Sequence, residues 1–128
     1  MNLLKLLLIA NVIVAASLIS MSGTPVPEQG RLEGIVADPS GDGIKGAFIL
    51  VHWDPAGPSV GPRTNVGIAQ DLIAYAAANG RFSIALPPGF YDVLFSASAF
   101  SPRAKKLRIL PGSILKYDAQ LKMEDKFR

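Results

Sequence analysis

The only histidine of the chain, His52, stands two residues before Asp54 in the run His52-Trp53-Asp54. A histidine beside a carboxylate can serve as a general base, so this pair is the first candidate for chemistry. One His and no Cys exclude a multi-His metal centre within one chain, thiolate zinc and a Cys nucleophile. We therefore expect His52 to be a structural residue at a surface or loop, with Asp54 or Asp71 beside it.

Residues 57–61 (GPSVG) match the G-x-S-x-G pattern of serine hydrolases. That motif requires a strand, a sharp turn and a helix, with the histidine after the serine. Here Pro58 disfavours the helix, and His52 precedes Ser59. The sequence predicts a long Gly/Pro-rich loop over residues 55–67 and no catalytic residue.

Residues 38–43 (DPSGDG) resemble the first half of a calcium-binding loop. The twelfth position of that loop would be Ile49, where a calcium loop carries a bidentate Glu. We expect a tight turn built on Asp and Gly, with a weak cation site as the open alternative. We therefore expect no metal and no cofactor.

The length and charge of the chain limit its function further. Its 128 residues suit one small domain and exclude the larger enzyme folds. Thirteen Lys and Arg stand against ten Asp and Glu, an excess too small and too scattered to indicate nucleic-acid binding. The basic run over residues 103–108 (RAKKLR) is expected to be a solvated strand face that discourages edge pairing.

The N-terminal segment has the pattern of an export signal. Lys5 precedes an apolar run over residues 6–19, too short to cross a bilayer as a helix, and small residues flank a cleavage site after Ser22. An uncleaved membrane anchor is the alternative, and only then would the chain contact a membrane. We expect an exported protein, periplasmic, extracellular or at the cell surface. The predicted organisation is a signal-peptide helix at 1–22, a linker at 23–29, a domain at 30–123 and a tail at 124–128.

The remaining residues alternate short apolar runs with turn signals, which predicts an all-β, seven-stranded, Greek-key-type β-sandwich of Ig-like kind. The expected strands are residues 31–37, 46–54, 68–78, 81–86, 90–97, 103–110 and 113–123. The alanines of residues 68–78 would also suit a helix, but the hairpin signal that follows favours a strand. The predicted core residues are Val36, Ile49, Val51, Phe82, Ile84, Leu86, Tyr91, Val93 and Phe95.

The dipeptide Asn79-Gly80 is the strongest short hairpin signal in the chain. A two-residue hairpin would pair the strand before it with the strand after it, and would place one apolar set on one face. The predicted pairs are Ala78 with Arg81, Ala77 with Phe82, Tyr75 with Ile84 and Ile73 with Leu86.

The strand over residues 46–54 is apolar on both faces. If Ile49 and Val51 face the core, Phe48 and Leu50 face outward. Either the 55–67 loop covers them or they form a partly open apolar patch, which marks an interaction site. Trp53 is expected to anchor the sandwich edge rather than stack on sugars. The candidate binding residues are Phe48, Leu50, His52, Trp53 and Arg63.

Several motifs in register resemble a carboxypeptidase regulatory-like domain. They are residues 34–41 (GIVADPSG), 44–47 (IKGA), 79–82 (NGRF), 86–93 (LPPGFYDV) and 99–102 (AFSP), followed by Pro111-Gly112. The resemblance implies a transthyretin-like or carbohydrate-binding-like sandwich that is generally non-catalytic. We expect an exported interaction or structural module of the cell envelope, whose partner is an envelope protein or polysaccharide. The alternatives are a carbohydrate-binding module using Trp53 or Tyr75 and, third, a hydrolase or a hydrolase subunit.

The export signal can be tested on protein from an exporting cell. Mass spectrometry should find an N-terminus near Gly23, because cleavage after Ser22 removes the apolar run. An intact Met1 in the membrane fraction would support the anchor instead.

Overall fold

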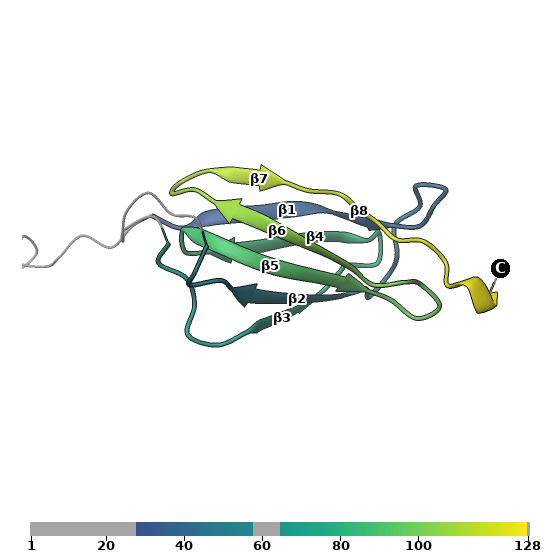
Figure 1. Cartoon of the computed structure of the whole chain (residues 1–128). Helices are drawn as coiled ribbons and strands as arrows, with labels where there is room; N and C mark the ends of the chain where they lie inside the picture. The colour runs from purple at the N-terminus through teal and green to yellow at the C-terminus, as the bar shows by residue number, and fades with distance from the viewer. Residues whose placement is uncertain (1–27, 58–64, 128) are drawn as a thin grey trace, which may run out of the picture.

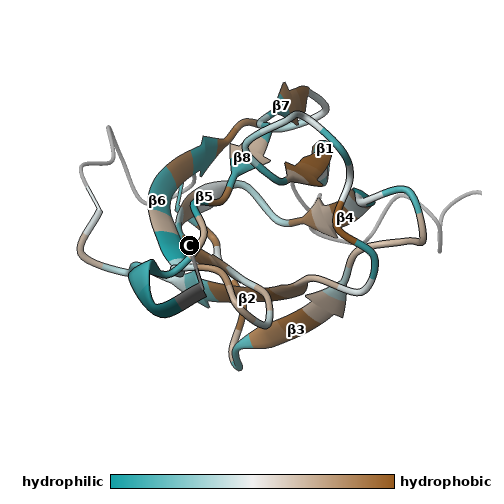
Figure 2. Ribbon diagram, turned by 90° about the vertical axis from the view of Figure 1, so that its right-hand side faces the viewer, coloured by the Kyte–Doolittle hydropathy of each residue, from teal (hydrophilic) through white to brown (hydrophobic). Residues whose placement is uncertain are grey.

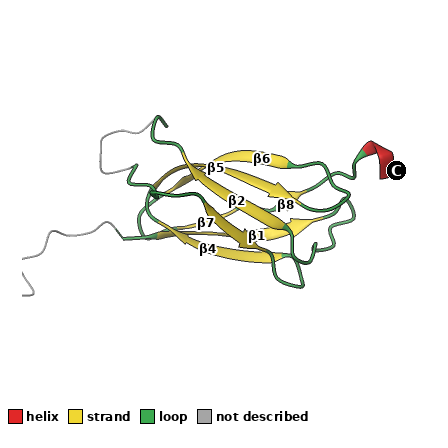
Figure 3. Ribbon diagram, turned by 90° about the horizontal axis from the view of Figure 1, so that it is seen from below, coloured by secondary structure: helices red, strands yellow, loops and turns green. Residues whose placement is uncertain are grey.

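The computed structural model describes residues 28–57 and 65–127. The described part is all-β except for one short 3-10 helix, η1 (Asp125–Phe127), next to the C-terminus (Figure 3). The predicted signal segment 1–22, Ser59 and Arg63 lie outside the described residues.

Eight strands of the described chain form two sheets that make a sandwich (Figure 1). The first sheet has the order β4 (Arg81–Leu86), β1 (Gly30–Ala37), β7 (Ile114–Lys116), and β8 (Ala119–Gln120) also pairs with β1. The second sheet has the order β3 (Leu72–Tyr75), β2 (Phe48–Trp53), β5 (Gly89–Ser96), β6 (Arg103–Ile109). The predicted all-β sandwich is confirmed.

The core lies between the sheets and follows the period-two alternation of the strands. Phe82 and Phe95, from opposite sheets, have ring centroids 5.5 Å apart at its centre. Tyr91 is fully buried, and its hydroxyl donates to Pro87 O at 2.6 Å. Burial raises the pKa of Tyr91 to about 12, so the phenol keeps its proton. All nine predicted core residues are buried.

The last predicted strand, residues 113–123, runs parallel alongside β1, and a break in the pairing at residues 117–118 divides it into β7 and β8. Between them Tyr117 N donates to Glu33 O at 2.8 Å, and Ile35 N donates to Asp118 Oδ1 at 3.1 Å. A Cβ at Gly34 would lie 1.8 Å from Tyr117 O. The chain at Tyr117 therefore lies so close to β1 that only glycine fits at position 34.

The predicted pairing across Asn79-Gly80 is wrong. The strand before the turn, β3, pairs antiparallel with β2, and the strand after it, β4, pairs antiparallel with β1 in the other sheet. Phe82, Ile84 and Leu86 are buried as predicted. Ile73 and Tyr75 were expected on the same face, but they are 55% and 67% exposed.

The turn itself forms, and its anchorage explains the change of sheet. Gly80 adopts a φ of +80°, and its amide donates to Ala77 O at 2.9 Å. Val36 N at the end of β1 donates to Gly80 O at 2.8 Å, which ties the turn to the first sheet. The chain then enters β4 along β1, where six residue pairs form a ladder. The strand β3 is left to complete the second sheet beside β2.

Two alanine substitutions separate the observed register from the hairpin register. Phe82→Ala should lower the free energy of unfolding by about 3–5 kcal/mol, because it opens a cavity against Phe95. Ile73→Ala should cost less than about 1 kcal/mol, because its side chain is half exposed. Urea unfolding measures both values, and equal large losses would support the hairpin register instead.

Candidate functional site

The outer side of the second sheet carries a contiguous apolar surface, which we call the β2–β3 face. It consists of Phe48, Leu50, Ile73, Tyr75 and Leu94. In the strand register, Phe48 lies opposite Tyr75, and Leu50 lies between Ile73 on β3 and Leu94 on β5. Ile73 and Tyr75 are exposed, and the other three are half-buried. Apolar residues that gather on one open sheet surface are typical of an interaction site.

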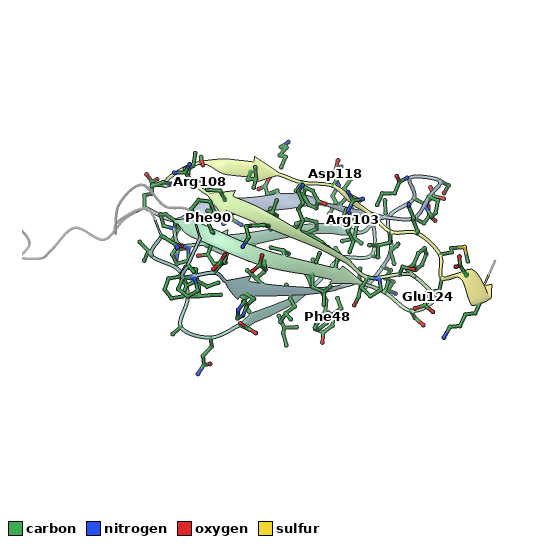
Figure 4. The ribbon with its side chains drawn as sticks, viewed as in Figure 1. Phe48, Phe90, Arg103, Arg108, Asp118 and Glu124 are labelled. Atoms are coloured by element: carbon green, nitrogen blue, oxygen red, sulfur yellow. The ribbon has the colours of Figure 1, made fainter. Side chains whose placement is uncertain are left out.

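The two aromatic rings of this face meet at an angle. The ring centroids of Phe48 and Tyr75 are 5.9 Å apart, with 67° between the ring planes. Figure 4 shows Phe48 at the lower side of the sandwich, beside β2 and β3. This edge-to-face contact holds the two rings together without making a flat stacking platform.

Charged side chains lie at one end of the β2–β3 face. His52 Nδ1 and Asp71 Oδ1 are 2.6 Å apart, and this contact joins β2 to the residue before β3. On the neighbouring strands Lys106 Nζ donates to Asp92 Oδ1 at 2.9 Å and also contacts Asp54 Oδ2. The hydrogen bond from Lys106 lowers the pKa of Asp54, and the same bond raises the pKa of Lys106. These groups are solvent-accessible, so the pairs order the surface more than they stabilise the fold.

Asn65 fastens the returning end of the long loop to the sandwich. Its Oδ1 accepts from Trp53 Nε1 at 2.7 Å and from Phe90 N at 3.1 Å, and its Nδ2 donates to Asp54 O at 2.9 Å. Gly67, with a φ of +73°, lies so close to the indole that a Cβ there would be 2.0 Å from a ring atom of Trp53. The Trp53 side chain therefore anchors the end of the loop to the sandwich.

The described ends of the loop cover one end of the outer surface only. Phe90 points outward from β5 but is 8% exposed, because Gly57 lies against its ring and the Arg108 guanidinium carbon stands 5.3 Å from the ring centroid (Figure 4). At the other end, Tyr75 remains 67% exposed. Residues 58–64 of the loop lie outside the described residues, so the choice between a covering loop and a partly open patch stays a prediction.

The structure brings together three of the five candidate binding residues. Phe48, Leu50 and His52 lie on the outer side of β2, and Trp53 points to the other side, where it packs against the core. Arg63 lies outside the described residues. Sequence reasoning missed Ile73 and Tyr75 at this face, because the run over residues 72–76 (LIAYA) is apolar in both alternating sets. Only the strand partner decides which set faces inward.

The turn over residues 38–43 uses its carboxylate internally. Asp38 Oδ1 accepts from Ser40 N at 2.9 Å, from Ser40 Oγ at 2.6 Å and from Asp42 N at 3.0 Å. The Ser40 hydroxyl is the main cause of the lowered pKa of Asp38. Within residues 28–57 and 65–127, three or more His, Cys, Asp or Glu side chains nowhere gather as metal ligands. The same residues contain no helix of the length and apolarity that a membrane crossing needs.

The sequence over residues 31–122 matches the family model of the carboxypeptidase regulatory-like domain. The chain belongs to this family. The match runs from the second residue of β1 past the end of β8, so it spans both sheets and the β2–β3 face of the carboxypeptidase regulatory-like domain. None of the curated proteins is similar enough in sequence to match the chain.

Solved structures of low sequence identity share the fold. The Bacillus anthracis TIE protein matches with a TM-score of 0.55 at 15% identity, over 75% of this chain and 17% of that one. A minor pilin of Streptococcus agalactiae matches with a TM-score of 0.55 at 14% identity, over 77% of this chain and 46% of that one. Catechol 1,2-dioxygenase from Acinetobacter radioresistens matches with a TM-score of 0.57 at 12% identity, over 78% and 53%. The chain thus corresponds to only part of each of these proteins, and the likeness establishes the sandwich alone.

The ion pairs of Lys106 make a pH-dependent contribution to stability. Because the pKa of Asp54 is lowered from 3.8, its ionised carboxylate stabilises the fold above pH 3.8. This contribution is lost as the pH falls through the lowered pKa. A raised pKa of Lys106 stabilises the fold below pH 10.5, and this contribution is lost as the pH rises through the raised value. The melting temperatures of wild type and Lys106→Met should therefore differ most between these limits and converge outside them.

Lys105→Met is the matched control for this measurement. Lys105 is the next lysine along β6, and it makes no ion pair with another described residue. The melting temperature of the Lys105→Met variant should equal that of the wild type at every pH. A Lys106→Met variant that also follows wild type would contradict the assigned pKa shifts.

Proposed function

We propose that this carboxypeptidase regulatory-like domain is a non-catalytic binding module of the cell envelope, and that a partner protein docks on its β2–β3 face. The observation that carries the proposal is the exposure of Ile73 and Tyr75 beside Phe48 and Leu50. An apolar centre with charged groups at its border is the usual composition of a protein-binding surface. The His52–Asp71 and Lys106 pairs supply that border.

Aromatic geometry favours a protein partner over a polysaccharide. A sugar ring stacks on an exposed flat aromatic surface, whereas Phe48 and Tyr75 meet at 67°. Trp53 is turned toward Asn65 and Gly67 in the loop. The exposed surface that remains combines aliphatic side chains with two aromatic rings that are not coplanar, which suits apolar side chains of a protein.

The surroundings of His52 support a role without chemistry. The depression beside it has a volume of about 260 Å³ and is lined by His52, Trp53, Pro55, Ile68, Ala69, Gln70 and Asp71. Among the described lining residues there is neither a hydroxyl nor a thiol, so none of them is a nucleophile that His52 could activate. The bond to Asp71 instead fixes the start of β3 against β2.

Export to the envelope is supported by the sequence and by one structural likeness. The apolar run over residues 6–19 follows a single basic residue, as in secretory signals. One of the proteins with the same fold is a minor pilin. A sandwich without Cys must be stable through its core alone, and all nine predicted core residues are buried.

Two isoleucines provide a matched test of the docking face. Ile73 on β3 is 55% exposed, and Ile114 on β7 of the other sheet is 60% exposed. Tagged wild type, Ile73→Ser and Ile114→Ser should be used to capture partners from an envelope extract. We expect Ile73→Ser to lose the captured protein about tenfold, as the loss of a buried apolar contact predicts, and Ile114→Ser to retain it.

Two outcomes would overturn the proposal. Equal capture by all three proteins, each shown to be folded by its melting temperature, would exclude the β2–β3 face as the docking site. A hydrolase activity of the purified protein that disappears in Ser59→Ala or His52→Ala would overturn the non-catalytic role.

A further inference from the structure

The two edges of the second sheet differ sharply in how they are protected. The strand β6 at one edge carries Arg103, Lys105, Lys106 and Arg108 among its seven residues. Charged residues, and Lys above all, discourage the addition of another strand. The strand β3 at the other edge has the sequence Leu-Ile-Ala-Tyr and no charge. In Figure 2 the strand β3 lies at the border of the sandwich and is largely brown, whereas β6 is largely teal.

The hydrogen-bonding pattern shows which groups of β3 face the open edge. Ala76 N donates to Ala47 O, and in this register Ala74 and Leu72 are the next residues that bond to β2. Asp54 N donates to Phe90 O on the other side of β2, which is consistent with the same alternation. The N–H and C=O groups of Ile73 and Tyr75 therefore point away from β2, and no described strand lies beyond them.

We propose that β3 pairs antiparallel with β3 of a second copy of this chain, around a two-fold axis at Ala74. In that register Ile73 lies opposite the second copy's Tyr75, and Tyr75 lies opposite the second copy's Ile73. Residue pairs that exchange both backbone bonds give four hydrogen bonds across the axis. A shift in one direction would use Ala77 N, which already donates to Arg81 O. A shift in the other direction would place Asp71 beside Tyr75.

The side chains of β3 are complementary to themselves in this register. On the outer side, Ile73 meets Tyr75, a β-branched residue against an aromatic one, which is a favourable cross-strand pair. On the inner side, the larger Leu72 meets the smaller Ala76, and Ala74 meets its own copy at the axis. Asp71, the nearest carboxylate, would lie opposite Ala77, so no like charges are brought together.

The pairing would join two β2–β3 faces into one apolar surface. Leu50 and Ile73 of one copy would continue into Tyr75 and Phe48 of the other across an eight-stranded sheet. The inference thus deepens the proposed function, and rests on it only for what the joined surface binds. The dimer also accounts for a bare edge on a chain whose other edge in the same sheet is charged.

The absence of Cys allows a direct test by disulfide trapping. In Ala74→Cys the only thiol lies at the axis, opposite its copy at a Cα separation of about 4.5 Å, within disulfide range. In the control Ala78→Cys the two thiols would be more than about 20 Å apart at the rise of a β-strand. The full chain should be produced in exporting cells, treated with a mild oxidant and analysed on a non-reducing gel. We expect a dimer band for Ala74→Cys and little or none for Ala78→Cys.

Light scattering on the Cys-free protein gives an independent measurement. Ile73→Lys removes two cross-strand pairs at once by symmetry, so it should raise the dimer dissociation constant about tenfold or more. Ile114→Lys, on the edge of the other sheet, should leave it unchanged. A wild-type protein that stays monomeric, equal trapping of both Cys variants, or trapping of Ala74→Cys to a different protein would each overturn the dimer. If the wild type is monomeric and Ile73→Ser still loses the captured partner, the dimer is overturned and the docking face is retained.

Discussion

The strand β2 is apolar on both sides, and a β-strand can turn only one side toward the core. Ile49 and Val51 are fully buried, so Phe48 and Leu50 must lie on the outer surface. Because β2 bonds to β3 on one side and to β5 on the other, these two apolar residues lie on an interior strand of the sheet and not at its edge. The arrangement of the outer surface follows from this one constraint.

The strand β3 enlarges the apolar surface and limits it at the same time. It brings Ile73 and Tyr75 alongside Leu50 and Phe48, and it ends the sheet on that side. At the far end, Asn65 holds the loop against Trp53 and Phe90, so that the outward ring of Phe90 is covered. On the described strands of the second sheet, the exposed large apolar side chains are Ile73 and Tyr75, and both belong to the β2–β3 face. This clustering on one face is what the proposed docking surface requires.

The charged groups around this face have a different role from the core. The Lys106 pairs and the His52–Asp71 contact are open to solvent, and such pairs contribute little to stability. They connect side chains of β2, β5, β6 and the segments next to them at the surface, and they give the apolar centre a polar border. Electrostatics at such a border guides a partner's orientation more than it adds affinity.

Local patterns were sufficient for the sandwich class and the core, because period-two alternation and turn residues act within a few positions. The burial of Phe82, Ile84 and Leu86 could be predicted without knowing which strand pairs with β4, because a serine and an alanine separate them along this strand. The placement of β3 depended on tertiary structure. Both alternating sets of residues 72–76 are apolar, and Asn79-Gly80 forms its turn in either arrangement. Two interactions decided the placement of β3: the hydrogen bond from Val36 to Gly80, and the backbone pairing of β3 with β2. Val36 and the β2 residues that pair with β3 all lie more than twenty residues before their partners in the chain. Long-range hydrogen bonding, which no local pattern encodes, therefore made Ile73 and Tyr75 surface residues.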